Sequence, residues 1–344
     1  MSAAHDLVSL FRSVLELCKV RAGESVAVLT EEGDRDAYAR AYLAAATQLG
    51  AHAMQVNVPR RAQPAGALNK QTSLTGNLLA MQALKHADMV IDLLGLLWSA
   101  EQTEIQKAGA RILMSREPVE VLRRMFPTVE RRRRVERAEV LLSRARELRV
   151  TSRAGTDVTY KLGKYPVITQ YGYTDQPGRW DNLSAGAFLY TGGDDDGVDG
   201  TVVIDKGDII FPFKRYVAEP IHLLVKRGRV EEIAGDGVDA DLLREYMRRY
   251  GDPRAYAISH IGWGMDESAQ WEFMGTSPVA QFSNGPDGRA YRGNVLFSTG
   301  PNLELGGSND TGCHLDIPLR SCDLFLDGQQ ILSAGEIVPP ELRD

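Results

Sequence analysis

At residues 25–30 the sequence reads Ser-Val-Ala-Val-Leu-Thr, a short apolar run that opens shortly after Gly23. Residues 36–49 follow with apolar and alanine positions at helical spacing, and Gly50 ends that pattern. Further apolar runs of strand length lie at 53–58, 89–94 and 111–114, separated or followed by helical patterns at 78–86, 101–107 and 119–125. Strands that alternate with helices of this length predict βαβ units and a parallel sheet. We therefore expect residues 1–128 to form an α/β domain with an open sheet.

The pattern changes after a charged segment at 129–148, which we interpret as a helix that links two domains. From 149 to 344 the chain is rich in turn residues, and short apolar runs lie between the turns at 201–204, 209–212, 221–225 and 324–326. This pattern predicts an antiparallel-sheet α+β domain. A dinucleotide cofactor is not expected, because no G-x-G-x-x-G follows the first strand and no phosphate-binding G-x-x-x-x-G-K-[ST] occurs.

The composition narrows the class of protein. The chain has 344 residues, a formal net charge of −6 and 43% hydrophobic residues. A negative net charge argues against a nucleic acid or a membrane surface as partner, since both attract basic proteins. No apolar run approaches the roughly 20 residues that span a bilayer. The three cysteines are too few and too scattered for a disulfide framework. We expect a soluble, cytoplasmic protein.

A candidate metal site lies near the C-terminus, where residues 313–318 read Cys-His-Leu-Asp-Ile-Pro. In a β-strand, His314 and Asp316 would project side by side from one face. His260 lies before two glycines and could supply a third ligand. Two histidines and one carboxylate are the ligand set of non-heme Fe(II) oxygenases. From the residues alone, hydrogen-bonded structural roles for the same side chains remain open.

Three segments, at 258–264, 296–302 and 313–320, resemble the 2,5-dihydroxypyridine 5,6-dioxygenase family of bacterial nicotinate and nicotine breakdown. Shorter matches at 74–78, 171–173, 177–181 and 207–214 extend the resemblance over nearly the whole chain. It implies an extradiol-type enzyme that holds Fe(II) on His260, His314 and Asp316. Such an enzyme cleaves the ring of a hydroxypyridine with O₂, converting 2,5-dihydroxypyridine to N-formylmaleamate. The resemblance also implies a homo-oligomer, a hexamer in the family, and a distant relation to thermophilic-type metallo-aminopeptidases.

The resemblance further assigns four residues to the substrate pocket. Ser298 matches a family position beside the substrate, and Leu97, Trp98 and Gln170 fall at family pocket positions. Two of these depart from the family pattern: Trp98 replaces a histidine and Gln170 replaces a glutamate. Asn182 also replaces a family histidine. Because a glutamine cannot act as a carboxylate base, these changes affect the choice of substrate more than the type of reaction.

Three other interpretations remain open at this stage. A metal-dependent hydrolase like the aminopeptidases would need carboxylates that bridge two metal ions, and its nearest candidates are Glu219, Glu267, Glu272 and Glu304. A dioxygenase of the same family could act on a different hydroxypyridine. The changes at Trp98 and Gln170 could also have produced an inactive binding protein. Metal content separates the classes: one iron per chain for the dioxygenase, two ions for the hydrolase and none for the binder.

Overall fold

The computed structural model describes residues 3–33, 35–61 and 71–343. The chain forms two compact units, the first from residues 1–127 and 171–185 and the second from residues 128–170 and 186–344. The sequence-based division placed 171–185 in the second domain and treated 129–148 as a linker. In the structure, residues 171–185 add a strand to the first unit, and the helix at 129–144 belongs to the second unit. Within the described ranges, no helix has both the length and the apolar character needed to cross a membrane.

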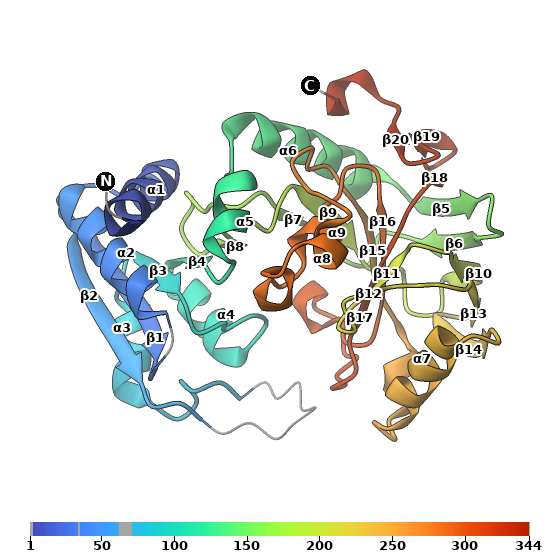
Figure 1. The fold of residues 1–344 in the computed structure, drawn as a ribbon, viewed down its shortest axis with the longest axis horizontal. Coiled ribbons are helices and arrows are strands. Elements are labelled where there is room, and N and C mark those ends of the chain that lie inside the picture. Colours follow the sequence, from blue (N-terminus) through green and yellow to red (C-terminus); the bar gives the residue numbers. More distant parts are fainter. Residues whose placement is uncertain (1–2, 34, 62–70, 344) are drawn as a thin grey trace. The chain divides into compact units, whose positions relative to one another are not determined.

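The first unit is built on a five-stranded parallel sheet, sheet A (Figure 1). Its strands, in spatial order, are β2 (His52–Val58), β1 (Ser25–Glu31), β3 (Met89–Asp92), β4 (Arg111–Met114) and β8 (Trp180–Asn182). All neighbours pair in parallel. The central residues of β1 and all of β3 and β4 are buried, because helices cover both faces of such a sheet. This explains why these strands are continuous apolar runs in the sequence.

The described part of the first unit contains the helices α1 (Ala3–Leu17), α2 (Asp36–Gln48), α3 (Leu78–Lys85), α4 (Ala100–Lys107) and α5 (Val119–Arg124). Two begin at side-chain caps: Asn77 accepts a hydrogen bond from the Ala80 amide at 3.1 Å, and Ser99 accepts one from the Gln102 amide at 3.1 Å. α3 and α4 pack with alternate residues of the sheet in one apolar cluster. The parallel-sheet domain expected from the sequence is therefore confirmed.

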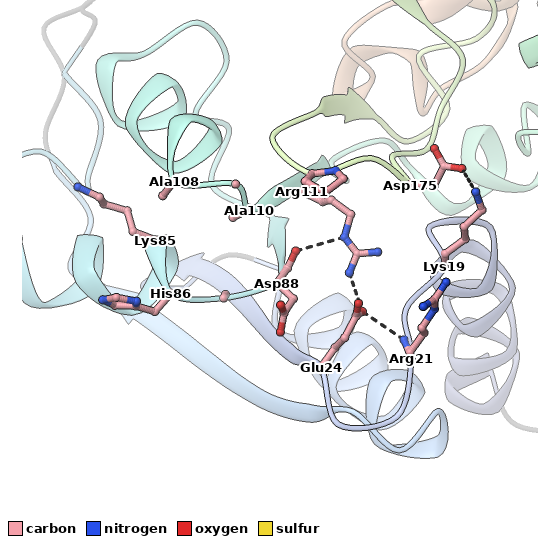
Figure 2. A pocket seen from close by; sticks show the side chains of 13 residues that line it. Lys19, Arg21, Glu24, Lys85, His86, Asp88, Ala108, Ala110, Arg111 and Asp175 are labelled. Atoms are coloured by element: carbon pink, nitrogen blue, oxygen red, sulfur yellow. Dashed lines mark hydrogen bonds and ion pairs between the residues drawn. The ribbon is translucent and has the colours of Figure 1, made fainter.

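A polar pocket of about 510 Å³ lies where the strands of sheet A begin. Figure 2 shows Arg111 among its lining residues, directed toward Glu24 and Asp88. The Arg111 side chain, 7% exposed, donates to the Glu24 carboxylate at 2.6 Å and to the Cys18 carbonyl at 2.6 Å. A third hydrogen bond reaches the Asp88 carbonyl at 3.2 Å. The charge of Arg111 is thus used within the fold, where it joins the loop before β1 to the loop before β3.

Replacing Arg111 with methionine should destabilise the protein by about 3 kcal/mol, near the lower end for breaking a buried ion pair. The lower end applies because Glu24 keeps 26% of its side-chain surface exposed and can be hydrated after the change. Urea denaturation should show a lower midpoint at an unchanged m-value. Arg21→Met is the matched control, since Arg21 lines the same pocket with an exposed side chain. Equal stability of the two variants would contradict this role for Arg111.

The second unit contains an eight-stranded antiparallel sheet, sheet B. Its order is β14 (Arg229–Ala234), β13 (Ile221–Lys226), β10 (Val198–Ile204), β6 (Asp157–Lys161), β5 (Glu147–Ser152), β18 (Cys322–Leu326), β19 (Gln329–Ser333) and β20 (Glu336–Ile337). Buried and exposed residues alternate along β13, as expected for a strand with one covered face. Helix α7 (Val238–Arg248) lies against β14 (Figure 1).

The second unit also contains sheet C, a five-stranded antiparallel sheet that carries the candidate site. Its order is β17 (Leu315–Leu319), β16 (Val295–Thr299), β15 (Ile258–Gly264), β9 (Phe188–Thr191) and β7 (Ile168–Gln170). Helix α6 (Val129–Arg144) packs against β7 and β9. The remaining elements are β11 (Ile209–Ile210), β12 (Arg215–Tyr216), α8 (Phe273–Thr276), α9 (Pro286–Arg289) and four 3₁₀ turns at Pro253–Tyr256, Ala280–Phe282, Leu303–Leu305 and Pro340–Leu342. The predicted antiparallel half is confirmed.

Candidate metal centre

His314 and Asp316 lie where the sequence predicts them, at the start of β17. His314 immediately precedes the strand and Asp316 is its second residue. Their side chains leave the backbone on one side, and His314 Nε2 lies 3.3 Å from Asp316 Oδ1. Asp316 pairs with Ser298 of β16 across the sheet, and the Ser298 hydroxyl lies 3.2 Å from His314 Nε2.

His260 reaches the same point from a β-bulge in β15. Ile258 pairs with Thr299 and Ile261 with Phe297, so β15 carries one more residue than β16 over this interval. A bulge redirects side chains and is frequent beside functional sites. The bulge contains His260, whose Nε2 lies 3.2 Å from Asp316 Oδ1. One nitrogen or oxygen atom from each of His260, His314 and Asp316 thus lies within 4.8 Å of the others.

Electrostatics holds the carboxylate of this cluster ionised. Burial alone would raise the pKa of Asp316, but the charge of His314 and the Arg289 guanidinium hold that pKa well below its usual range. Arg289 Nε donates to Asp316 Oδ2 at 2.6 Å. The other oxygen, Oδ1, faces the two imidazole nitrogens. Burial lowers the pKa of His314, and the Asp316 charge more than offsets this, so the net direction is upward.

One face of sheet C brings several of the predicted residues together. Ser298 pairs with Asp316, and the next strands place Tyr190 opposite Gly262 and Gln170 opposite Phe188. Because side chains alternate along a strand, Ser298, Tyr190 and Gln170 face the same side as the cluster. Gln170 is buried, with 7% of its surface exposed. A neutral amide that can both donate and accept is therefore on the cluster face.

Leu97 and Trp98 belong to the first unit, in the loop after β3. Ligands of open α/β sheets bind beyond the carboxyl ends of the strands, which is where this loop lies. The buried Asp92 carboxylate shapes the loop by accepting from the amides of Leu94, Gly95 and Leu96 at 3.0, 2.7 and 2.7 Å. Trp98 has a left-handed backbone (φ 59°), and its ring lies 5.1 Å from that of Trp180. Trp98 is thus partly a packing residue of the first unit.

Two residues beside the cluster were not expected from the sequence. Arg289 is separated from Asp316 by 27 positions and reaches it from the short helix α9. Tyr190 packs on His260 from β9, with ring centroids 4.4 Å apart. Neither belongs to a motif of spaced ligands. The alternation of Phe188 and Tyr190 on one strand was a signal for a shared face, but it did not indicate which face.

Among the residues that the structure describes, His260, His314 and Asp316 form a group that could hold a metal ion, and no second group of at least three such ligands is found. Of the carboxylates considered for a bridged pair of ions, Glu267 is bound to Arg131 and Arg134 at 3.3 and 2.5 Å. Its carboxylate is thus engaged in ion pairs inside the second unit. The geometry favours a site for one ion.

The fold and the site together define a two-unit protein with a parallel α/β sheet and, on an antiparallel sheet, a candidate metal site formed by two histidines and one aspartate. A family model described as 2,5-dihydroxypyridine 5,6-dioxygenase matches residues 6–339. The chain belongs to this family, which confirms the resemblance seen in the sequence.

Individual proteins of known function or structure are similar to this chain in sequence and in fold. A 2,5-dihydroxypyridine 5,6-dioxygenase from Pseudomonas putida strain KT2440 is 47% identical over 344 residues, which cover 98% of this chain and 97% of the relative. The solved structure of a 2,5-dihydroxypyridine dioxygenase from Pseudomonas putida KT2440 matches with a TM-score of 0.96 and 45% identity over 100% of both chains. Wild-type AmpT from Thermus thermophilus matches with a TM-score of 0.62 at 14% identity, covering 98% of this chain and 100% of its own, and this likeness shows the fold alone.

Proposed function

We propose that this protein is a ring-cleaving dioxygenase that acts on 2,5-dihydroxypyridine and O₂ and uses Fe(II) bound by His260, His314 and Asp316. Family membership supports the reaction type and the substrate. The main support for the metal site is that Asp316 Oδ1 lies 3.2 Å from His260 Nε2 and 3.3 Å from His314 Nε2. The proposed product is N-formylmaleamate.

The residues present fit a divalent first-row metal. Asp316 Oδ1 is buried and accepts no hydrogen bond from outside the cluster among the described residues. Metal ligands bind in their deprotonated form, so a bound cation would take the place of the His314 proton as the positive charge beside the Asp316 carboxylate. Imidazole suits several metals, but two histidines and one carboxylate with open positions are typical of Fe(II) oxygenases. When bound there, Fe(II) supplies the redox chemistry that O₂ requires.

The protein's own groups position the reactants. Arg289 occupies Asp316 Oδ2, which leaves Oδ1 directed at the two histidines. The Ser298 hydroxyl lies 3.2 Å from His314 Nε2 and can donate a hydrogen bond to a ring oxygen bound at the cluster. Holding ring and O₂ at one place replaces a bimolecular encounter, which lowers the entropic part of the barrier. Because Gln170 is neutral, it orients the ring and does not remove a proton.

The function is tested by oxygen uptake. Protein loaded anaerobically with Fe(II) is mixed with 2,5-dihydroxypyridine, and O₂ consumption and product mass are followed. The expected result is one O₂ consumed per ring, with both oxygen atoms in the product. His260→Ala, prepared in the same way, should show no uptake. Uptake that survives this change, or absence of uptake by the iron-loaded parent, would contradict the proposal.

Gln170→Glu should raise kcat/KM for 2,5-dihydroxypyridine by about tenfold, since a positioned carboxylate can accept the proton of the ring hydroxyl whereas the amide cannot. Steady-state kinetics over a set of substituted hydroxypyridines measures this effect. If the parent instead prefers a differently substituted ring, the glutamate variant should shift preference back toward 2,5-dihydroxypyridine. Unchanged kinetics on every ring would show that position 170 does not contact substrate.

A further inference from the structure

The second ring nitrogen of His260 has no hydrogen-bond partner among the residues that the structure describes. Metal-binding histidines usually donate the second ring nitrogen to a carboxylate, a carbonyl or water, and this bond fixes the ring. In this protein His260 Nε2 faces Asp316, while Nδ1 is buried and makes no hydrogen bond to any described residue. The side chain is only 5% exposed. Apart from Asp316, the contacts by which the described residues can orient this ring are therefore packing contacts.

Tyr190 makes such a packing contact. Its ring centroid lies 4.4 Å from that of His260 with an interplanar angle of 36°. Tyr190 pairs with Gly262, two residues beyond His260 on the neighbouring strand. A Cβ atom at position 262 would lie 2.7 Å from both Cα and Cβ of Tyr190, so only glycine lets the tyrosine approach this closely. Tyr190 is 4% exposed, and this close packing leaves its ring and that of His260 little freedom.

The same side chain has a second neighbour. Gln170 lies on the adjacent strand β7, on the same face and diagonally across from Tyr190, and both side chains are buried. Burial, together with the charges of Glu304 and Asp316, raises the pKa of Tyr190 well above its usual value, so the phenol stays neutral. One side chain therefore packs on His260 through its ring and lies beside the predicted substrate amide of Gln170.

We propose that Tyr190 is a positioning residue that fixes the His260 ring by aromatic packing, and that its hydroxyl binds and fixes the neighbouring Gln170 amide. The inference deepens the proposed function and rests on it for the part that concerns Gln170. It assigns to packing a task that a hydrogen bond performs at most metal-binding histidines. Removing the ring and removing the hydroxyl should then have separate effects.

The ring is tested with Tyr190→Met, since methionine adapts to fill the space of the lost aromatic. Co(II), which neighbours Fe(II) in the affinity order, is titrated into metal-free protein while its visible absorption is recorded. Tyr190→Met should weaken Co(II) binding about 10- to 100-fold, as other losses of a positioning group do. Phe188→Met is the matched control. Phe188 lies on the same strand, is 5% exposed and stacks on Tyr190 at 6.1 Å, and it should keep the parent affinity.

The hydroxyl is tested with Tyr190→Phe, which keeps the ring. Co(II) affinity should stay within about threefold of the parent, while KM for 2,5-dihydroxypyridine rises about three- to tenfold and kcat changes less, as expected for one neutral hydrogen bond. Parent affinity in Tyr190→Met, or equal losses in Tyr190→Met and Phe188→Met, would overturn the role of the ring. An unchanged KM in Tyr190→Phe would overturn the role of the hydroxyl. If Tyr190→Met does not fold, Tyr190→Leu takes its place in the Co(II) titration.

Failure of the proposed function would be recognised separately. Co(II) titration needs no turnover, so a parent protein that binds Co(II) but consumes no O₂ would refute the dioxygenase and leave the role of the Tyr190 ring standing. Normal O₂ consumption by the parent protein, together with parent Co(II) affinity in Tyr190→Met, would support the dioxygenase and refute the role of the Tyr190 ring.

Discussion

His314→Ala is expected to abolish stoichiometric metal binding while the protein stays folded. His314 supplies one of the three converging atoms, and its Nε2 lies 3.3 Å from Asp316 Oδ1. Its side chain is 27% exposed, so truncation leaves no large buried cavity, and the free energy of unfolding should change by about 1 kcal/mol or less. Activity should fall about a thousandfold or more, because metal catalysis contributes several kcal/mol and each 1.4 kcal/mol is a factor of ten.

Metal content by elemental analysis after desalting, circular dichroism and oxygen uptake together measure this result. His222→Ala is the control, since His222 is an exposed histidine of β13 in the same unit. It should bind one metal ion per chain and turn over like the parent. Full occupancy in His314→Ala would show that the ion is held elsewhere. An unfolded His314→Ala would show that the histidine is structural, which is the interpretation that the sequence alone leaves open.

Local patterns in the sequence predicted the elements well where burial is periodic. The apolar runs of β1, β3 and β4 and the helical spacing of α2 can be recognised without knowledge of long-range contacts, because the pattern of buried residues lies within each element. The chain order of the two units was harder to predict. β8, only three residues long, extends sheet A after the chain has already formed β5, β6 and β7 of the second unit. Nothing in the three residues themselves indicates pairing with β4.

The candidate site also has contacts that follow from the local sequence and contacts that depend on distant strands. The adjacency of His314 and Asp316 follows from the two-residue period of a strand, which is local. The approach of His260 depends on a bulge, and the contact with Tyr190 depends on register between strands some 70 positions apart, as the pairing of Gly262 with Tyr190 shows. A shift by one residue would turn Tyr190 to the other face. Such register is set by tertiary packing. The residues alone therefore offered His260 only as a possible third ligand, the family resemblance assigned it to iron, and only the structure supplied Tyr190.

Gly262→Ala is expected to destabilise the protein by about 3 kcal/mol or more and to weaken metal binding at the same time. The added Cβ would lie 1.9 Å from the Leu189 carbonyl oxygen and 2.7 Å from Tyr190 Cα. These are backbone atoms that cannot move aside as a flexible side chain can. β15 and β9 must therefore separate, which costs more than ordinary overpacking of a core. Because β15 carries His260 and β9 carries Tyr190, the same movement disturbs the candidate metal centre.

The comparison that isolates this effect is Gly207→Ala. Gly207 has a left-handed backbone (φ +88°), but no atom lies within 4 Å of the added Cβ. Its replacement should cost only about 1–2 kcal/mol of backbone strain and leave Co(II) affinity unchanged. Chemical denaturation and Co(II) titration of both variants distinguish strain from steric exclusion. If Gly262→Ala were as stable as Gly207→Ala and bound Co(II) like the parent, the close approach of the two strands would not be what holds His260 in place.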